Sequence, residues 1–155
     1  MPSRHDPWYA FTVALQPAHK AWQAAAGVAL ATSGLSVAVA TPVLLVSRLG
    51  DGVPQCVLAA KIGVHPAALV RTLDQAEQAQ LLERRMVSGN RRVRAIHLLP
   101  EGRRLARKME AAVQALRVEL LGDLPEPDIV AATRVLLALE QRARSYAAPA
   151  RPDST

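Results

Sequence analysis

The chain has 155 residues, enough for one domain with extensions. Half of the residues are apolar but only 3% are aromatic, so the core must consist mainly of Ala, Leu and Val, which let helices pack closely. The net charge of +6 favours a polyanionic partner, nucleic acid first and an anionic membrane second. The single cysteine, Cys56, excludes an intrachain disulfide and fits a reducing cytoplasm, and residues 1–8 do not resemble a signal peptide.

Two helices are predicted in the first third of the chain. The first runs from Trp8 to Leu30, with Pro17 as a kink or a boundary. The second is capped by Ser36 and runs to Leu49. Pro42 either bends this helix or restarts it, with Thr41 as the new cap.

An uncharged stretch covers much of both helices. Residues 21–47 carry no charge and are long enough to span a bilayer. The Thr-Ser-Gly sequence at 32–34 interrupts them, however, and alanine is a weak membrane anchor. We therefore expect two buried helices joined by a turn, and a membrane span is the weaker alternative.

A helix-turn-helix is predicted next. Residues 54–62 form a short helix, and Gly63 follows where a left-handed turn residue costs little. His65 and Pro66 open another helix, with proline in its first turn. The buried face of this helix carries apolar residues at helical spacing, namely Leu69, Leu73 and Ala76. Ala59 and Gly63 are small, as the tight corner between the two helices requires.

A two-stranded wing follows. Residues 81–87 are short and β-like, and residues 93–98 alternate apolar and polar side chains as a half-buried strand does. Between them, Ser88-Gly89-Asn90 has the composition of a turn. Positive charge is concentrated in this region, because nine basic residues and only one acidic residue lie between Arg84 and Lys108.

Two more helices are predicted to complete the chain. After residues 100–102, a fifth helix carries apolar residues at core spacing, namely Leu105, Met109, Ala112, Leu116 and Leu120. Residues 124–127 interrupt the helical pattern, and Asp128 is expected to cap a sixth helix. One side of that helix is apolar and consists of Ile129, Ala132, Leu136 and Leu139.

These residues resemble the MarR family of transcriptional regulators. The family's wing has Asp-Arg-Arg, an alternating strand, then Leu-Thr, two variable residues and Gly. This chain has Asn90-Arg91-Arg92, the strand 93–97 and the sequence 98–102 with the same length throughout. Residues 71, 74 and 77 are Arg, Asp and Glu, as the family usually has in its recognition helix.

Three residues depart from the family pattern. Asn90 replaces an acidic residue that braces the wing, so a charge pair becomes at best a neutral hydrogen bond. Leu99 replaces the threonine that caps the fifth helix, at a cost of about 1 kcal/mol. Gln80 replaces the glycine expected after the recognition helix.

The resemblance implies a mainly α fold with a small two- or three-stranded β wing, a winged helix-turn-helix with flanking dimerisation helices. It divides the chain into an N-terminal dimerisation segment (1–34), a DNA-binding domain (35–100), C-terminal dimerisation helices (101–147) and a disordered tail (148–155). It also implies a homodimer that reads an inverted repeat in double-stranded DNA. The apolar faces of the first, fifth and sixth helices independently favour a dimer.

The expected DNA-binding residues lie on the recognition helix and the wing: His65, Ala67, Ala68, Arg71, Gln75, Arg91, Arg92 and Arg94. The two alanines would meet thymine methyl groups, while Arg71 would read a guanine and Gln75 an adenine. The wing arginines would contact phosphates or the minor groove. For Arg71, a phosphate contact or a pair with Asp74 is the alternative. For the basic run 103–108, a solvated face is the default interpretation, with DNA backbone contact as the alternative.

Trp22 and Arg48 are the candidate ligand-binding residues, since many relatives respond to small aromatic acids or phenols. The alternative for Trp22 is a place in the core or the dimer interface. The four histidines and Cys56 lack metal-site spacing, so no metal or cofactor is expected. Cys56 is expected to be a small buried residue rather than a redox sensor.

The sequence therefore predicts a cytoplasmic, DNA-binding transcriptional regulator, a repressor relieved by a ligand. It is not expected to be an enzyme, because no catalytic motif is found. The alternative from a different class is a winged-helix module that binds another protein and does not bind DNA specifically.

Overall fold

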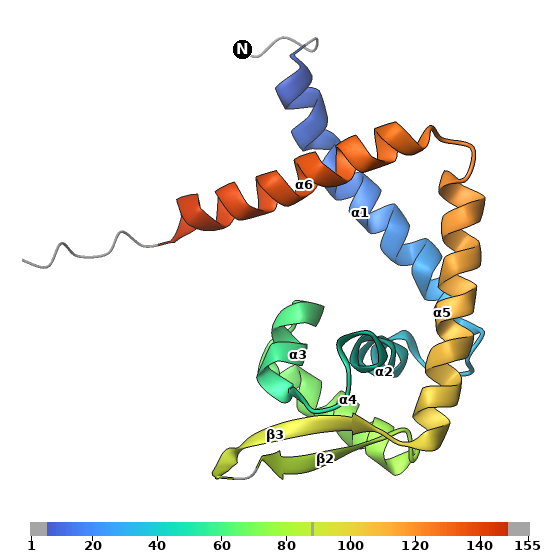
Figure 1. The fold of residues 1–155 in the computed structure, drawn as a ribbon, viewed down its shortest axis with the longest axis vertical. Coiled ribbons are helices and arrows are strands. Elements are labelled where there is room, and N and C mark those ends of the chain that lie inside the picture. The colour runs from blue at the N-terminus through green and yellow to red at the C-terminus, as the bar shows by residue number, and fades with distance from the viewer. Residues whose placement is uncertain (1–5, 88, 149–155) are drawn as a thin grey trace, which may run out of the picture. The chain divides into compact units, whose positions relative to one another are not determined.

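The computed structural model describes residues 6–87 and 89–148, and the side chains of residues 90–92 also lie outside the description. The chain divides into two compact units, Met1–Arg117 and Val118–Thr155. The elements are α1 (Pro7–Ala31), α2 (Val37–Leu49), β1 (Val53–Pro54), α3 (Gln55–Ile62), α4 (Pro66–Gln78), β2 (Leu82–Val87), β3 (Asn90–Leu98), α5 (Pro100–Leu121) and α6 (Glu126–Ala147). The predicted fold class is confirmed (Figure 1).

The two proline-containing helices are continuous. Pro17 lies inside α1, so it is not a boundary. Ser36 caps α2 by accepting a hydrogen bond from the Val39 amide at 3.4 Å, as predicted. Pro42 lies inside α2 and is buried, so the helix does not restart at Thr41. The core that surrounds Pro42 holds both halves of α2 in one helix, which overrides the local preference of proline.

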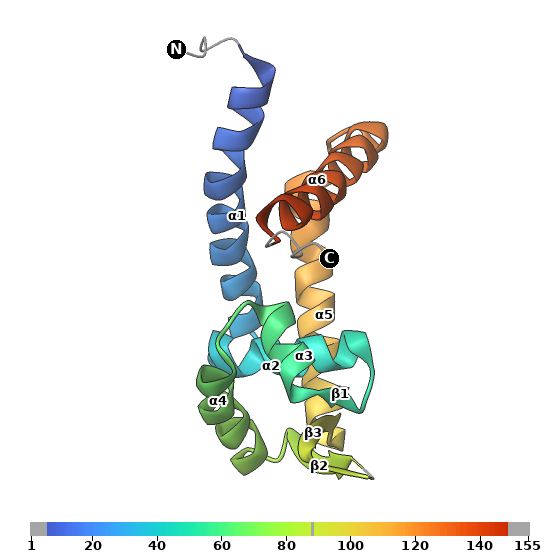
Figure 2. The same cartoon turned by 90° about the vertical axis from the view of Figure 1, so that its left-hand side faces the viewer.

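The helices α1 and α2 differ in how much of each is buried. Six residues of α2 are buried, whereas Leu30 is the one fully buried residue of α1. The expectation of two buried helices is thus confirmed for α2 and wrong for most of α1. The reason is geometric, because α1 extends well beyond the helices and strands that cover α2 (Figures 1 and 2). No single helix in the described part of the chain is long and apolar enough to cross a membrane. Taken together, α3 and α4 have the length and the apolar composition of a membrane span, but the pair is bent by 107°.

The wing is part of a three-stranded antiparallel sheet in the order β1-β3-β2. Val53 of β1 pairs with Ile96, and Leu82 of β2 pairs with Leu98. The inward side chains of the sheet join the core through Leu82 and Ile96, which are 1% and 0% exposed. The base of the wing is therefore anchored in the same core as the helix-turn-helix.

A close approach ties α5 to the turn before β2. The amide of Leu99 donates a hydrogen bond to the carbonyl oxygen of Leu81 at 2.9 Å. A Cβ atom on Gly102 would lie 1.9 Å from that same oxygen. Gly102 is needed because α5 begins directly against this carbonyl. Gln80, just before Leu81, adopts a left-handed φ of 56°, which explains why the family prefers glycine at this position.

One arginine joins α4 to the wing. Arg84 of β2 donates a hydrogen bond from Nε to Oε2 of Glu77 at 3.0 Å, and its backbone amide donates to Oε1 of Glu77 at 2.8 Å. Its Nη2 also pairs with Asp74. The Arg84 side chain is only 19% exposed, whereas its partners Asp74 and Glu77 are 47% and 31% exposed. The hydrogen bond from Arg84 is the main reason that the pKa of Glu77 falls below its ordinary value.

In the second unit, α6 begins at Glu126 with Pro125 at the cap position. Asp128 therefore lies in the first turn, and the prediction that it caps the helix is wrong. Pro127 is tolerated inside this turn because a first-turn amide has no partner in the helix. Within the described residues, α6 has no buried side chain, and Val130, Leu136 and Leu137 are exposed.

Replacing Gly102 by Ala should destabilise the protein by at least about 2 kcal/mol, because the methyl group would collide with backbone that cannot move freely. Gly27→Ala is the matched control, since its Cβ would lie 3.5 Å from a Val37 methyl group, an ordinary contact. It should raise stability by up to about 1 kcal/mol, the helix preference of Ala over Gly. Urea unfolding of both variants measures this. Equal stability of the two variants would contradict the close approach.

The Glu77–Arg84 pair should make stability depend on pH. Because the pKa of folded Glu77 is lowered from its ordinary value of 4.5, ionised Glu77 stabilises the fold above that pH. This contribution is lost as the pH falls below about 4.5 towards the folded-state pKa. The stability difference between wild type and Glu77→Gln should therefore shrink on acidification, as followed by urea unfolding from pH 7 to pH 3. Arg84→Met should reduce the pH dependence in the same way, and a difference that does not change with pH would contradict the pair.

Candidate nucleic-acid interface and neighbouring pockets

The helix-turn-helix consists of α3 and α4, which meet at 107°. Gly63 makes the turn with a left-handed φ of 79°, and its amide donates to the carbonyl oxygen of Ala59 at 2.9 Å. The ring of His65 caps α4, because its Nδ1 accepts a hydrogen bond from the Ala67 amide at 3.2 Å. The neutral ring that accepts at Nδ1 carries its proton on Nε2, which leaves a donor on this exposed residue.

The α4 helix buries one face and exposes the opposite one. Leu69, Leu73 and Ala76 are buried, as predicted. Ala67, Arg71 and Gln75 are exposed and follow one another at four-residue spacing, so they share one face. The structure therefore brings these three predicted residues together on one exposed surface.

Ala68 has other surroundings than expected, and one alternative for Arg71 is excluded. Ala68 is exposed but lines a small hollow between α2 and α4, to one side of the face that carries Arg71. The alternative pair of Arg71 with Asp74 is not formed, because Asp74 pairs with Arg84. Arg71 makes no ion pair within the described part of the chain, so its guanidinium is available to a ligand.

The wing lies at the same end of the first unit as α4 (Figure 2). Arg94 of β3 is exposed and lines a hollow of about 240 Å³ together with Cys56 and Pro66. It therefore lies beside the first turn of α4. The backbone of Arg91 and Arg92 belongs to β3, but their side chains lie outside the described residues. Cys56 is exposed, so the expectation that it is buried is wrong: it lies in the first turn of α3, on the side away from the core.

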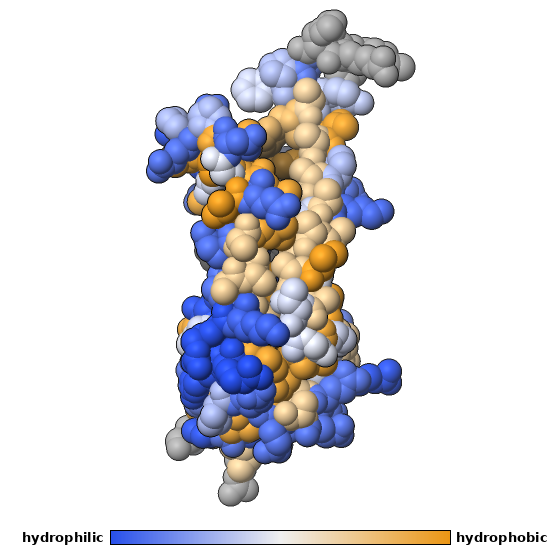
Figure 3. Space-filling model, turned by 90° about the vertical axis from the view of Figure 1, so that its right-hand side faces the viewer, coloured by the Kyte–Doolittle hydropathy of each residue, from blue (hydrophilic) through white to orange (hydrophobic). Residues whose placement is uncertain are grey.

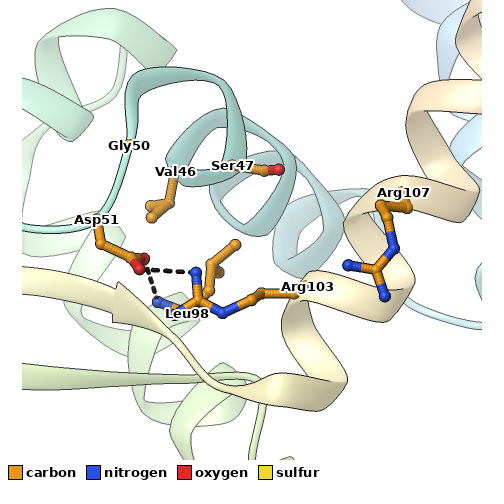
Figure 4. Close-up of a pocket in the computed structure, with 7 residues that line it drawn as sticks. All are labelled: Val46, Ser47, Gly50, Asp51, Leu98, Arg103 and Arg107. Atoms are coloured by element: carbon orange, nitrogen blue, oxygen red, sulfur yellow. Dashed lines mark hydrogen bonds and ion pairs between the residues drawn. The ribbon is translucent and has the colours of Figure 1, made fainter.

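Two arginines of the basic run 103–108 are already paired. Arg103 contacts Asp51 at 2.7 Å, and Oδ1 of Asp51 accepts the Leu98 amide at 2.9 Å (Figure 4). Burial opposes ionisation of Asp51, but the hydrogen bonds from Leu98 and Arg103 outweigh it and lower the pKa. Arg104 pairs with Glu101 at 2.6 Å. Asp51 thus fastens the α2–β1 loop to β3 and α5, a role that the sequence did not reveal because Asp51 stood in an ordinary helix-ending loop.

Hydrophilic residues gather where the wing and α5 begin. On the face seen in Figure 3, they gather at the lower left, next to an apolar area, at the end of the molecule where Figure 1 places these two elements. Arg107 and Lys108 are exposed there and form no ion pair among the described residues. They add to the positive charge beside the wing.

A larger pocket of about 490 Å³ lies between α1, α2, α3 and α5, and both Trp22 and Arg48 line it. Sequence reasoning thus selected two residues that are far apart in the chain and share one pocket. Lys61 and Arg117 line it as well. Behind them, Glu110 of α5 bridges two arginines, with Oε2 2.7 Å from Nε of Arg48 and Oε1 3.1 Å from Nη1 of Arg117. The bond from Arg48 is the main cause of the lowered pKa of Glu110.

Comparison with known proteins relates this architecture to a family. No protein-family model matches the sequence. Among solved structures, the transcriptional regulator PA3341 matches with a TM-score of 0.80 and 30% identity, over 87% of this chain and 98% of that chain. CouR from Rhodococcus jostii RHA1, solved with bound p-coumaroyl-CoA, matches with a TM-score of 0.72 and 26% identity, over 90% of this chain and 94% of that chain.

Further matches agree with these two. FabT from Streptococcus pneumoniae, solved in complex with DNA, matches with a TM-score of 0.70 over 90% of this chain and 99% of that chain, and its 18% identity shows likeness of fold alone. Two more matching structures, at 22% and 26% identity, are described as MarR-family regulators. Together with the helix-turn-helix, the wing and the flanking helices, these matches show that the chain belongs to the MarR family of transcriptional regulators.

Proposed function

We propose that the chain binds double-stranded DNA sequence-specifically through α4 and the wing. The observation that carries this proposal is the exposed face of α4 with Ala67, Arg71 and Gln75, presented at a helix-turn-helix corner of 107°. A helix presented in this way enters the major groove with its first turns against the base edges. The DNA complex of FabT, which has the same fold, supports this assignment.

Each predicted residue has a role in this proposal. Arg71 binds a guanine or a phosphate, and Gln75 binds an adenine, for which its amide has both a donor and an acceptor. Ala67 and Ala68 contact thymine methyl groups, with Ala68 at the edge of the contact. His65 and Arg94 contact the phosphate backbone beside the start of α4, and Arg91 and Arg92 contact phosphates or the minor groove.

The proposed binding form is a homodimer that recognises an inverted repeat. In its support, α6 has no buried residue within the described part and exposes Val130, Leu136 and Leu137. Such apolar surface is covered in solution by a partner. A twofold dimer would place two α4 helices in major grooves about 34 Å apart.

A small-molecule effector is proposed to relieve DNA binding, so that the chain acts as a repressor. The pocket lined by Trp22 and Arg48 combines an aromatic wall with positive charge, which suits an aromatic acid or a phenol. The complex of CouR with p-coumaroyl-CoA supports an effector that carries an aromatic group. Binding to α2 and α3 at this pocket would shift the helix-turn-helix away from its DNA-binding position.

The wing arginines give the test of this function. A binding sequence is first selected from a random pool of double-stranded DNA, and we expect an inverted repeat with half-sites about one helical turn apart. Wild-type affinity should fall steeply with salt, with a slope in log K of about −0.9 for each phosphate contact. Combined replacement of Arg91 and Arg92 by Ala should abolish the mobility shift while gel filtration still shows a dimer.

A variant with Arg134→Ala and Arg142→Ala is the charge-matched control, since it removes the same charge from exposed positions of α6. Because α6 belongs to the proposed dimer interface, gel filtration must first show that this control is still a dimer, and it should then keep its DNA affinity. If the wing variant bound DNA as tightly as wild type, the DNA assignment would be wrong. The chain would then fit a winged-helix module that binds another protein.

A further inference from the structure

A hollow of about 180 Å³ lies where the end of α2 meets the end of β3 and the start of α5 (Figure 4). Its wall includes Val46 and Leu98, which belong to the buried core and hold this part of the wall in place. The polar and charged residues of the wall are Ser47, Asp51, Arg103 and Arg107. None of these residues lines the pocket that contains Trp22 and Arg48, so the hollow is a separate feature of the fold.

Two arginines of α5 supply the cations of this wall. Arg103 and Arg107 are four residues apart, so they lie on one face of the helix. Figure 4 shows both side chains on the side of α5 that faces the end of α2. Arg103 contacts Oδ2 of Asp51 at 2.7 Å, whereas Arg107 forms no ion pair among the side chains that the structure describes. The Arg107 guanidinium is therefore available to a ligand.

The charges around the hollow leave it positive. The two guanidiniums are opposed by the carboxylate of Asp51 and by the C-terminal end of α2, which acts as about half a negative charge. Asp51 is held at Arg103, because its Oδ1 also accepts the amide of Leu98 at 2.9 Å. Exposed Lys108 follows Arg107 on α5 and adds to the positive potential. The hollow therefore favours an anion.

The size and the donors of the hollow suit a phosphate group. An apolar cavity of about 150 Å³ holds a benzene ring, which has more heavy atoms than a phosphate. Planar guanidiniums bind phosphate oxygens through paired N–H donors. The hydroxyl of Ser47 adds a donor from α2. A phosphate carries more oxygens and more charge than a carboxylate, so it can engage both guanidiniums and this hydroxyl at once.

We propose that this hollow is a phosphate-binding site, in which Arg103, Arg107 and Ser47 bind one phosphate group. Arg103 keeps Asp51 as a partner and offers its remaining N–H donors to the phosphate. The bound group links α2 to α5 beside the fastening that Asp51 makes. It belongs either to a small phosphorylated molecule or to the backbone of DNA, and the test separates these two sources.

Binding is measured on the whole protein without DNA, through the NMR signals of the arginine Nε–H groups. The probe is inorganic phosphate, which replaces chloride at constant ionic strength. We expect the Arg107 signal, identified by its absence from Arg107→Met, to shift and to saturate. Arg107→Met should lower the phosphate affinity at least about tenfold, the usual cost of a lost charge-assisted hydrogen bond. Lys108→Met removes the same charge from the next position, outside the hollow, and should leave the affinity nearly unchanged.

Asp51→Asn tests the part played by Arg103. The amide oxygen of asparagine can still accept the hydrogen bond from Leu98, but the charge that competes with phosphate for Arg103 is gone. Phosphate affinity should therefore rise in this variant. Thermal unfolding shows whether each variant is folded, and Arg107→Met decides the proposal separately if the asparagine variant is not.

The source of the phosphate is identified by mobility shifts on the selected inverted repeat. If the group belongs to DNA, the duplex should displace inorganic phosphate, and Arg107→Met should weaken DNA binding and reduce the salt slope by about 0.9. If it belongs to a small molecule, Arg107→Met and Lys108→Met should bind DNA equally tightly.

The proposal is overturned if inorganic phosphate does not shift the Arg107 signal, or if Arg107→Met and Lys108→Met lower the phosphate affinity equally. Equal effects would mean that phosphate is attracted by the general charge of α5 and not bound in the hollow. The phosphate titration uses no DNA, so its result is independent of the proposed function. A chain that binds phosphate in the hollow but no DNA would contradict the DNA assignment alone.

Discussion

The ion-pair network around Arg84 makes α4 and the wing one structural unit. Asp74 and Glu77 lie on α4, and Arg84 lies on β2, so one guanidinium adds a polar tie between two elements that also share the hydrophobic core. Because the Arg84 side chain is mostly buried, its charge-assisted hydrogen bonds are worth more than those of a fully exposed pair. The exposed face of α4 keeps a fixed orientation to the wing as a result.

The core supports this unit from the other side. The α2 helix passes through the first unit with six buried residues, and the sheet adds Leu82 and Ile96 to the same core. The contact of Gly102 with the Leu81 carbonyl then sets where α5 starts relative to the wing. Asp51 adds a second fastening between the α2–β1 loop, β3 and α5. A ligand that moves α2 or α3 would therefore change the position of the whole proposed DNA-binding surface.

Local sequence signals predicted most of the fold. The cap residues Ser36 and His65, the turn residue Gly63 and the apolar periodicity of α4 each act through their immediate neighbours, so the sequence alone revealed them. The errors came where distant parts of the chain decide the outcome. Pro42 was read as a possible restart, but core packing keeps α2 whole. The first helix is expected to be buried because its second half carries no charge, yet most of the helix has nothing in the described chain to cover it.

In the candidate site, too, local features could be predicted from the sequence and contacts between distant residues could not. The face formed by Ala67, Arg71 and Gln75 was predictable, since four-residue spacing defines it. The partners of Glu77 and Asp51 were not, because they lie on other elements. The pair between Arg48 and Glu110 joins residues 62 positions apart, which no spacing rule can indicate.

Glu77→Gln tests whether the Arg84 network orients α4 for specific recognition, through the ratio of specific to non-specific DNA affinity. Removing an acidic residue near DNA should by itself strengthen binding to every sequence through electrostatics. If the network orients α4, the specific affinity should lag behind, so that the ratio falls by about tenfold, an energy of about 1.4 kcal/mol. A ratio equal to that of wild type would contradict the claim.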